Sequence, residues 1–245
     1  TLKIKLIFMT KKKILIATGG TGGHIFPALS LAKNLIKKNY DVILTTDKRG
    51  LKYLGDINEI NLKKITSSPL VKKNIFRLIY SVLLICFSLV KSIFLLSLNR
   101  PHIIIGMGGY SSFPVCLSGY LLKIPIIIYE NNLVIGRANK FLLPLSKKIL
   151  VSNESIVGIK KKYKNKIFFT GYFIRDKIFK IIKEKNTINK SNLSILIIGG
   201  SQSAKIFGDE IPKVIKKCHD QGIFFDLFQQ CLDNQKNNLQ NIYKN

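Results

Sequence analysis

The chain has 245 residues, 47% of them hydrophobic, and 40 lysines and arginines against 13 acidic residues, which gives a formal charge of +27. The apolar content excludes a disordered chain, and the length fits one large domain or two small ones. The charge favours a polyanionic neighbour (nucleic acid, an anionic membrane surface or a phosphorylated substrate), or it reflects a general bias towards lysine. Because the total charge does not single out nucleic acid, we expect no nucleic-acid partner.

The cysteines and histidines give no indication of a metal site. Three histidines are widely separated, and no C-x-x-C spacing occurs among the four cysteines, Cys86, Cys116, Cys218 and Cys231. We therefore expect a reduced compartment, no metal and no cofactor. Residues 1–8 lack the small-residue cleavage site of a signal peptide, and the first methionine is Met9.

Short apolar runs alternate with helical patterns along the first 175 residues. The pattern predicts a helix at residues 26–38, a second one after the glycine-rich stretch 106–114, and strands at 13–17, 41–46, 102–109, 124–132, 147–152 and 166–173. Continuous apolar strands separated by helices are typical of a parallel α/β sheet. Ligands bind such sheets at the carboxyl ends of the strands, where the glycine-rich stretches lie.

Residues 75–98 form a long, almost entirely apolar segment with one narrow polar stripe. At about 100° per residue the stripe contains Arg77, Ser81, Ser88, Lys91 and Ser92. The longest uncharged run, 78–90, is short of the roughly 20 residues that span a bilayer. The segment therefore predicts a buried helix, a helix at the surface of an anionic membrane, or a spanning helix, and the basic residues just upstream favour the membrane surface over a span.

The pattern starts again after a polar stretch. We expect a first domain at residues 11–176, a linker at 177–192 and an incomplete second α/β domain at 193–245. The second domain begins with a predicted strand at 193–200 and has a predicted helix at 211–217. Its tail, residues 233–245, is polar and has little to pack.

The first glycine-rich stretch, "IATGGTGGHIFP" at residues 16–27, excludes two nucleotide-binding motifs by its spacing. After Gly20 and Gly22, the dinucleotide motif G-x-G-x-x-G needs a glycine at position 25, which is Ile25, and no phosphate-binding G-x-x-x-x-G-K-[ST] motif occurs. Bare amides before a helix N-terminus favour a site for an anion or a closely packed polar ligand. The alternative is a tight turn that serves packing alone.

Five motifs in order resemble the MurG family of peptidoglycan glycosyltransferases. They are "GGTGGH" at 19–24, "GMGGYSS" at 106–112, "YENN" at 129–132, "TGYFIR" at 170–175 and "GGSQSA" at 199–204. The chain departs from the family pattern at Tyr129, Asn131 and Ser203, which replace a histidine, a glutamine and a glycine. After residue 217 nothing resembles the family's segment that holds the uridine of the donor.

The resemblance implies a fold of the GT-B type, with two Rossmann-like domains and parallel sheets, the second domain being incomplete here. It implies an inverting transferase without a metal, which moves N-acetylglucosamine from UDP-GlcNAc to the 4-hydroxyl of the N-acetylmuramyl unit of lipid I and so makes lipid II. It also implies peripheral attachment to the cytoplasmic face of the plasma membrane, at an anionic surface. The alternative is a non-catalytic homologue that keeps a membrane-associated acceptor-side domain. An NAD-type oxidoreductase lacks its motif.

The resemblance also implies roles for individual residues. His24 is the expected general base, or it only orients its loop, and Glu130 is the expected partner of acceptor or loop, or a structural carboxylate. The residues expected to bind UDP-GlcNAc are Thr21, Gly22, Gly23, Asn132, Arg175, Ser201 and Gln202. The expected acceptor-side residues, unless they merely cap the next helix, are Gly108, Gly109, Tyr110 and Ser111.

Overall fold

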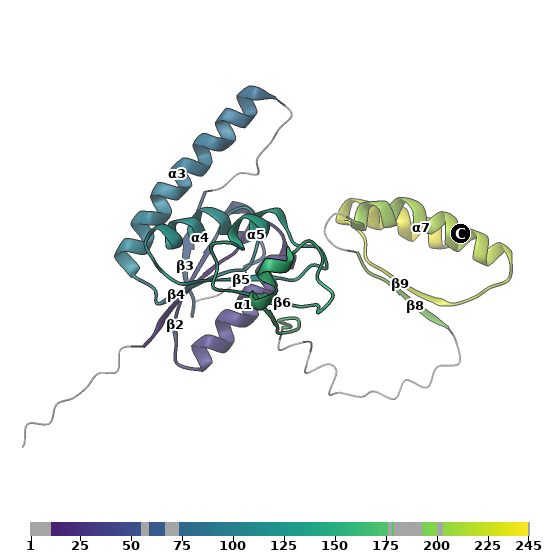
Figure 1. Cartoon of the computed structure of the whole chain (residues 1–245). Coiled ribbons are helices and arrows are strands. Elements are labelled where there is room, and N and C mark those ends of the chain that lie inside the picture. Colours follow the sequence, from purple (N-terminus) through teal and green to yellow (C-terminus); the bar gives the residue numbers. More distant parts are fainter. Residues whose placement is uncertain are drawn as a thin grey trace, which may run out of the picture. The chain divides into compact units, whose positions relative to one another are not determined.

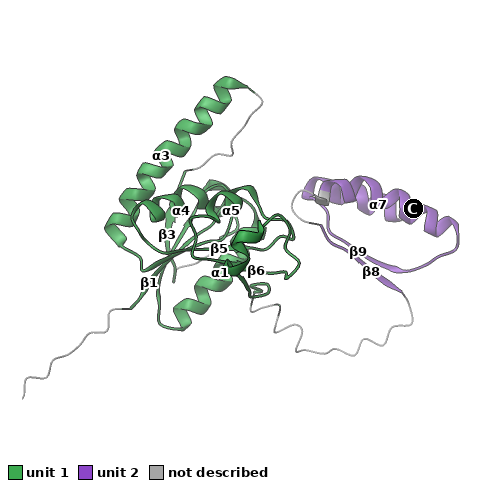
Figure 2. Ribbon diagram, viewed as in Figure 1, with its two compact units in different colours: residues 1–183 green, residues 184–245 purple. Residues whose placement is uncertain are grey.

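A computed structural model of the chain describes residues 11–54, 59–66, 74–175, 178, 193–199 and 203–244. The chain divides into two compact units, residues 1–183 and residues 184–245 (Figures 1 and 2). The predicted roles of Ser201 and Gln202, and most of the predicted linker at 177–192, lie outside the described residues.

The first unit is built on a seven-stranded parallel sheet in the order β3-β2-β1-β4-β5-β6-β7. Its strands are β1 Lys13–Ala17, β2 Asp41–Thr46, β3 Asn61–Lys64, β4 Ile103–Gly106, β5 Ile126–Glu130, β6 Lys148–Val151 and β7 Ile167–Phe169. Its helices are α1 Gly22–Lys37, α2 Lys48–Leu51, α3 Ile75–Asn99, α4 Ser112–Leu121 and α5 Arg137–Leu142, with a 3-10 helix at Lys161–Lys166. The predicted parallel α/β sheet is confirmed.

Both faces of this sheet are packed, as its continuous apolar strands require. Neighbouring residues of β1 alternate between two clusters of buried side chains: Leu15 contributes to one and Ile14 and Ile16 to the other. The order of the strands reverses between β1 and β4, where Ala17 pairs with Gly106. In open α/β sheets this switch point is where ligands bind.

Among the element boundaries that differ from the sequence predictions, those of α1 and β4 lie at glycines. Helix α1 begins at Gly22 instead of residue 26, since Gly22 and Gly23 form its first turn. Strand β4 ends at Gly106 instead of residue 109, since Gly108 and Gly109 adopt φ of +84° and +83°. These left-handed angles are open to glycine and break the extended backbone.

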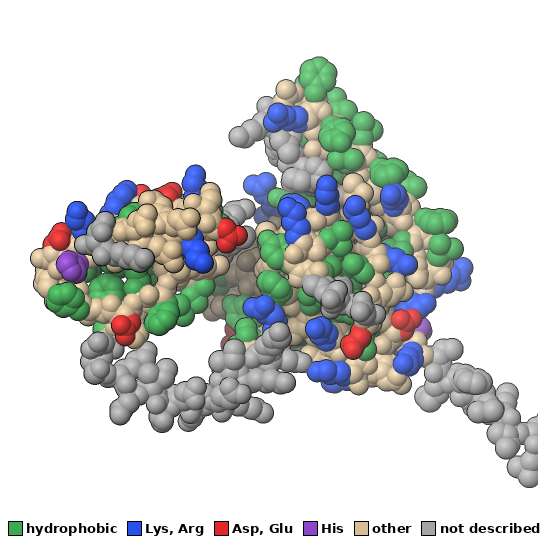
Figure 3. Space-filling view, turned by 180° about the vertical axis from the view of Figure 1, so that it is seen from behind, with side chains coloured by type: hydrophobic (Ala, Val, Ile, Leu, Met, Phe, Trp, Pro, Cys, Tyr) green, Lys and Arg blue, Asp and Glu red, His purple; other side chains and the backbone are tan. Residues whose placement is uncertain are grey.

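Helix α3 packs on α4 through its serine stripe and exposes most of its apolar side chains. Ser81, Ser88 and Ser92 are buried, and the hydroxyl of Ser118 in α4 donates to the carbonyl oxygen of Leu89 at 3.1 Å. The best 18-residue window of α3 has a mean hydropathy of 2.3 and is only 17% buried, so the predicted alternative of a buried helix is wrong. Figure 1 shows the end of α3 that begins at Ile75 projecting beyond the sheet, and Figure 3 shows hydrophobic side chains along this projection.

The second unit is a two-stranded parallel sheet with two helices. Strand β8 Ser194–Ile197 pairs with β9 Asp226–Gln229, and the helices are α7 Ser203–Asp220 and α8 Lys236–Lys244, with a 3-10 turn at Asp233–Gln235. Residues 236–244 of the predicted polar tail form α8, in which Leu239 is buried to 5% exposure and most of the other described side chains are exposed.

Candidate functional site

The two glycine loops of the first unit meet at the switch point of the sheet. Gly109 lies directly against the backbone of Gly19, so closely that a Cβ at position 109 would collide with the carbonyl oxygen of Gly19. A Cβ on Gly19 would in turn collide with the hydroxyl of Ser111. The bare backbone of both loops is therefore required for their close approach.

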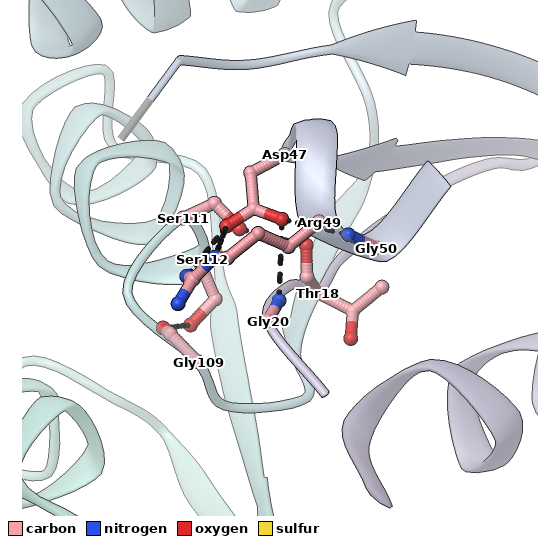
Figure 4. A network of polar contacts seen from close by, with 8 residues as sticks. All are labelled: Thr18, Gly20, Asp47, Arg49, Gly50, Gly109, Ser111 and Ser112. Atoms are coloured by element: carbon pink, nitrogen blue, oxygen red, sulfur yellow. Dashed lines mark hydrogen bonds and ion pairs between the residues drawn. The ribbon is translucent and has the colours of Figure 1, made fainter. Parts of the chain in front are cut away.

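Hydroxyl groups of the second loop fix this contact (Figure 4). Ser111 Oγ donates to the carbonyl oxygen of Thr18 at 2.9 Å, and Ser112 Oγ donates to that of Gly109 at 2.9 Å. Ser111 occupies the N-cap position of α4 but makes no side-chain cap hydrogen bond. Its hydroxyl joins the two loops and does not cap the helix.

A buried carboxylate braces the first loop from the end of β2. Asp47 Oδ1 accepts the N–H of Gly50 at 2.9 Å and that of Gly20 at 3.3 Å. Its Oδ2 accepts Nε and Nη2 of Arg49 at 3.1 and 2.7 Å (Figure 4). Burial alone would raise the pKa of Asp47, but the hydrogen bonds from Arg49 and the two amides outweigh it and lower that pKa.

A second buried carboxylate, that of Glu130 at the end of β5, organises the loop that follows it. Oε1 accepts the backbone N–H and the side-chain amide of Asn132 at 3.1 and 2.8 Å. Oε2 accepts the N–H of Gly136 at 2.8 Å and the side-chain amide of Asn139 at 2.9 Å. Glu130 is 1% exposed, and these four donors come from the loop and the start of α5. The carboxylate therefore fixes the shape of this loop.

The same loop completes the first turns of α1. Pro27 lies inside α1 and has no N–H, so the carbonyl of Gly23, four residues earlier, lacks its helical donor. The side-chain amide of Asn131 donates to this carbonyl at 2.8 Å. The loop after β5 is thus joined to the N-terminal turn of α1.

His24, in the first turn of α1, lies against the second glycine loop. A Cβ on Gly108 would come within 2.9 Å of Cε1 and Nδ1 of the imidazole, so the glycine makes room for the ring. Nδ1 is buried and has no hydrogen-bond partner among the described residues. Burial lowers the pKa of His24, and the nearby carboxylate of Glu130 and the backbone of Met107 only partly offset this. The imidazole is therefore neutral at neutral pH.

A cavity of about 290 Å³ brings several predicted residues together. Those lining it are His24, Glu130 and Asn132 with Gly108, Gly109 and Tyr110, and the loop and α5 residues Gly136, Arg137, Ala138 and Asn139. It joins a neutral histidine, a buried carboxylate and left-handed glycines in one hollow, which suits proton transfer to or from a bound polar ligand.

The other predicted residues that the structure describes lie outside the lining of this cavity. Thr21 is the exposed N-cap of α1 and makes no side-chain cap hydrogen bond. Gly22 and Gly23 form the first turn of α1, and the guanidinium of Arg175 lies 4.4 Å from the ring centroid of Phe26. Among the described residues no group of three or more histidine, cysteine or acidic side chains could hold a metal ion.

Several residues of the site were not predicted from the sequence. They are the bracing residues Asp47, Arg49, Asn131 and Asn139 and the lining residues Gly136, Arg137 and Ala138. Two signals were present. An acidic residue directly follows the apolar strand β2, at the ligand-binding edge of the sheet, and a proline lies inside a helix, where it removes a donor. Which partners these residues meet depends on the strand order.

A parallel sheet with glycine loops at its switch point defines a Rossmann-like ligand-binding protein. Residues 14–151 match the model of the glycosyltransferase family 28 N-terminal domain. The chain therefore belongs to glycosyltransferase family 28.

Curated relatives carry the name UDP-N-acetylglucosamine–N-acetylmuramyl-(pentapeptide) pyrophosphoryl-undecaprenol N-acetylglucosamine transferase. That of Pelagibacter ubique is 39% identical over 206 residues, which cover 83% of this chain and 56% of the relative. The relative from Rickettsia felis is 36% identical over 216 residues, which cover 84% of this chain and 57% of the relative. The chain thus spans little more than half the length of these relatives.

Solved structures confirm the predicted α/β fold of the GT-B type. MurG of Acinetobacter baumannii matches with a TM-score of 0.71 at 23% identity, over 96% of this chain and 65% of that one. Arabidopsis thaliana UGT89C1, complexed with UDP-L-rhamnose, matches with a TM-score of 0.59 at 13% identity, over 91% and 66%.

Proposed function

We propose that this chain carries the acceptor-side part of a transferase that moves N-acetylglucosamine from UDP-GlcNAc to the 4-hydroxyl of the N-acetylmuramyl unit of lipid I, giving lipid II. The observation that carries the proposal is the cavity that joins His24, Glu130 and Asn132 to the second glycine loop. The names of the curated relatives, which are 39% and 36% identical to this chain over the aligned residues, support the choice of donor and acceptor.

His24 acts as the general base in this proposal. Its Nδ1 is buried, which leaves Nε2 to meet the acceptor hydroxyl. Nε2 takes the hydroxyl proton while the oxygen bonds to the anomeric carbon of the donor, and the bond from that carbon to UDP breaks. The leaving UDP keeps the electron pair, and the anomeric configuration inverts. The lowered pKa of His24 keeps the base in its neutral, active form.

Glu130 acts mainly through the residues that it holds. Its four hydrogen bonds fix the loop that carries Asn132 into the cavity, and its charge stabilises the imidazolium that forms on His24. Gly108, Gly109 and Tyr110 would contact the acceptor, with Ser111 supporting them from beneath. The donor would meet Thr21, Gly22, Gly23 and Asn132, together with Arg175, Ser201 and Gln202.

The test is transfer by the 245-residue protein of labelled GlcNAc from UDP-GlcNAc to a lipid I analogue, followed as labelled disaccharide. Product that is lost in the His24→Ala protein and kept in a His219→Ala control would support the proposal. Binding of the acceptor analogue without any product would assign the chain to the non-catalytic alternative instead.

Helix α3 supports peripheral attachment to the cytoplasmic face of the plasma membrane. In water a helix normally buries its apolar face, but α3 buries serines and leaves Phe87, Val90 and Phe94 between 52% and 67% exposed. Arg77 and Lys91 are exposed on the same helix, where they could meet anionic headgroups. Contact with the lipid of a membrane would remove these exposed apolar side chains from water.

Flotation with phosphatidylglycerol vesicles tests this attachment. Replacing Phe87 and Phe94 together by Gln should weaken binding by at least tenfold, because each buried phenyl group contributes about 1.5–3 kcal/mol. The matched control replaces two exposed phenylalanines of β7, Phe168 and Phe169, which are 59% and 51% exposed. Equal binding by the two double variants would remove α3 from this role.

A further inference from the structure

One cationic side chain at the glycine loops has no part in the proposed transfer chemistry. Arg49 lies in α2, directly after β2, and its side chain is 48% exposed. Its Nε and Nη2 donate to the same oxygen of Asp47, at 3.1 and 2.7 Å. Nη1, with two of the five N–H donors of a guanidinium, has no acceptor among the residues that the structure describes.

The guanidinium is held between the two glycine loops. Its Nη2 lies 3.6 Å from the place that a Cβ on Gly20 would occupy, and Gly20 has a φ of +85°. Its Cζ lies 5.7 Å from the ring centroid of Tyr110, which lines the cavity. Asp47 is 3% exposed and is fixed by the amides of Gly20 and Gly50, so it presents the guanidinium in one orientation (Figure 4).

We infer that Arg49 binds a phosphate oxygen of the acceptor's diphosphate through its unpaired Nη1, and that Asp47 is the residue that positions it. This rests on the proposed function, because it assigns the group of the acceptor that is held beside Tyr110. A guanidinium presents a planar set of donors that matches phosphate oxygens. Its orientation by Asp47 reduces the entropy lost on binding. Because Asp47 is buried, an approaching anion meets the cation and not the carboxylate.

Diphosphate groups occur in both substrates, so the experiment separates the two sources. The 245-residue protein is titrated calorimetrically with inorganic pyrophosphate, with geranyl diphosphate as a soluble polyprenyl diphosphate, and with UDP. Arg49→Gln should weaken binding of pyrophosphate and geranyl diphosphate by about 10- to 100-fold, the size expected for a hydrogen bond between charged groups, and leave UDP unchanged.

The adjacent residue supplies a matched control. Lys48 is exposed in the same short helix, and Lys48→Gln removes the same charge. It should change the affinity for geranyl diphosphate by less than about twofold, because charges that are exposed to water interact weakly at a distance. Arg49→Lys should lie between Arg49→Gln and the unchanged protein, because it keeps the charge and loses the fork.

Asp47→Asn tests the positioning role. The amide oxygen can still accept the N–H groups of Gly20 and Gly50, but the ion pair that orients Arg49 is lost. The affinity for geranyl diphosphate should fall by about threefold to tenfold while the far-UV circular dichroism stays unchanged. Unaltered affinity with an intact fold would show that Asp47 has only a structural role.

Several results would overturn the assignment of Arg49. The first is an equal affinity of the Arg49→Gln and unchanged proteins for the diphosphates, and the second is an equal loss of affinity in Arg49→Gln and Lys48→Gln. The third is a loss of affinity for UDP alone. The fourth is that the unchanged protein binds none of the three anions. The transfer assay separates this inference from the proposed function. If the protein transfers GlcNAc but binds geranyl diphosphate equally well without Arg49, only the inference about Arg49 is contradicted. If binding of geranyl diphosphate depends on Arg49 but no transfer occurs, only the proposed function is contradicted.

Discussion

Helices α1 and α3 belong to the same unit but differ in the kind of side chain that each mostly buries. α1 buries Ala28 and Ala32 against the sheet, also buries Ile25, and carries His24 to the cavity. α3 buries three serines and only one apolar residue, Leu96, and exposes most of its apolar surface. The first pattern is that of a helix in a water-soluble core, and the second is that of a helix whose outer surface meets lipid.

The difference shows that hydrophobicity alone does not decide which side of a helix is buried. Two of the three buried serines of α3 satisfy their own hydroxyls: Ser81 Oγ donates to the carbonyl of Arg77 at 2.8 Å, and Ser92 Oγ to that of Ser88 at 2.7 Å. Their small size lets α4 approach closely, as small residues do between membrane helices. The comparison can be tested by making the same kind of change in both helices.

The largest expected effect comes from truncating matched apolar side chains. Ile25→Ala in α1 should lower the free energy of unfolding by about 3 kcal/mol, because Ile25 is fully buried and the change leaves a cavity. Leu83→Ala in α3 should cost less than about 0.5 kcal/mol in water, because Leu83 is 62% exposed. Urea unfolding of both variants in the absence of lipid measures the difference, and similar losses would show that the exposed side of α3 around Leu83 has an apolar partner within the chain.

The sequence predicted the sheet well because its central strands carry unbroken apolar runs. The predicted strands at residues 13–17 and 41–46 have the same bounds as β1 and β2. The sequence predicted the polar stripe of α3 but not that this stripe is the side packed on α4. Periodicity shows that two faces of a helix differ in polarity, but it does not show what each face contacts. The short strand β3 and helix α8 were missed, because their polar residues carry little hydrophobic signal.

The sequence motifs pointed to residues that meet at the cavity, but not to the residues that hold the loops in place. His24, Glu130, Asn132, Gly108 and Tyr110 meet at one cavity because three parallel strands end at the same edge of the sheet. The braces were not predicted. Asp47 reaches Gly20 across 27 positions of the chain and Asn131 reaches Gly23 across 108, and such pairs follow from strand order and not from local pattern.

The next effect concerns the chemistry that α1 carries. His24→Ala should lower transfer by about 10²-fold or more, about 2.7 kcal/mol in barrier height, because the general base is lost. The pH dependence sharpens this. Since the pKa of His24 is lowered below 6.5, activity should persist at neutral pH and fall only as acid protonates the imidazole. An unchanged acid limb of the rate profile in the His24→Ala protein would assign that limb to another group.

The same shift makes a statement about stability. The folded protein holds His24 with a lowered pKa, so the unfolded chain binds the proton more readily. The contribution of neutral His24 to the free energy of unfolding is fully present above pH 6.5. It is lost as the pH falls through the lowered pKa of His24 in the folded protein. Unfolding measured between pH 4 and pH 8 should show a smaller loss on acidification in His24→Ala than in the unchanged protein.

A smaller effect tests how the start of α1 is completed. Asn131→Ala should cost about 1 kcal/mol, because the carbonyl of Gly23 loses its side-chain donor. In a Pro27→Ala background residue 27 regains the N–H that this carbonyl lacks, so the cost of Asn131→Ala should shrink towards zero. A double-mutant cycle from denaturant unfolding measures this coupling. Equal costs in both backgrounds would show that the hydrogen bond and the proline act independently.

The smallest expected effect lies on the buried side of α3. Ser88 is fully buried, and its hydroxyl has no hydrogen-bond partner among the described residues, unlike those of Ser81 and Ser92. Ser88→Ala should therefore leave stability within about 0.5 kcal/mol or raise it slightly, because an unpaired hydroxyl is removed from the interface.

Ser88→Leu is the matching change in the other direction. It adds the apolar surface that a conventional amphipathic helix would bury, yet it should cost about 1–3 kcal/mol, because α4 lies too close to admit a larger side chain. If the leucine stabilised the protein instead, the interface between α3 and α4 would be an ordinary core with a gap in it. A small effect of Ala with a large cost of Leu identifies a contact selected for close approach, which is what a helix needs when its apolar surface is turned towards lipid.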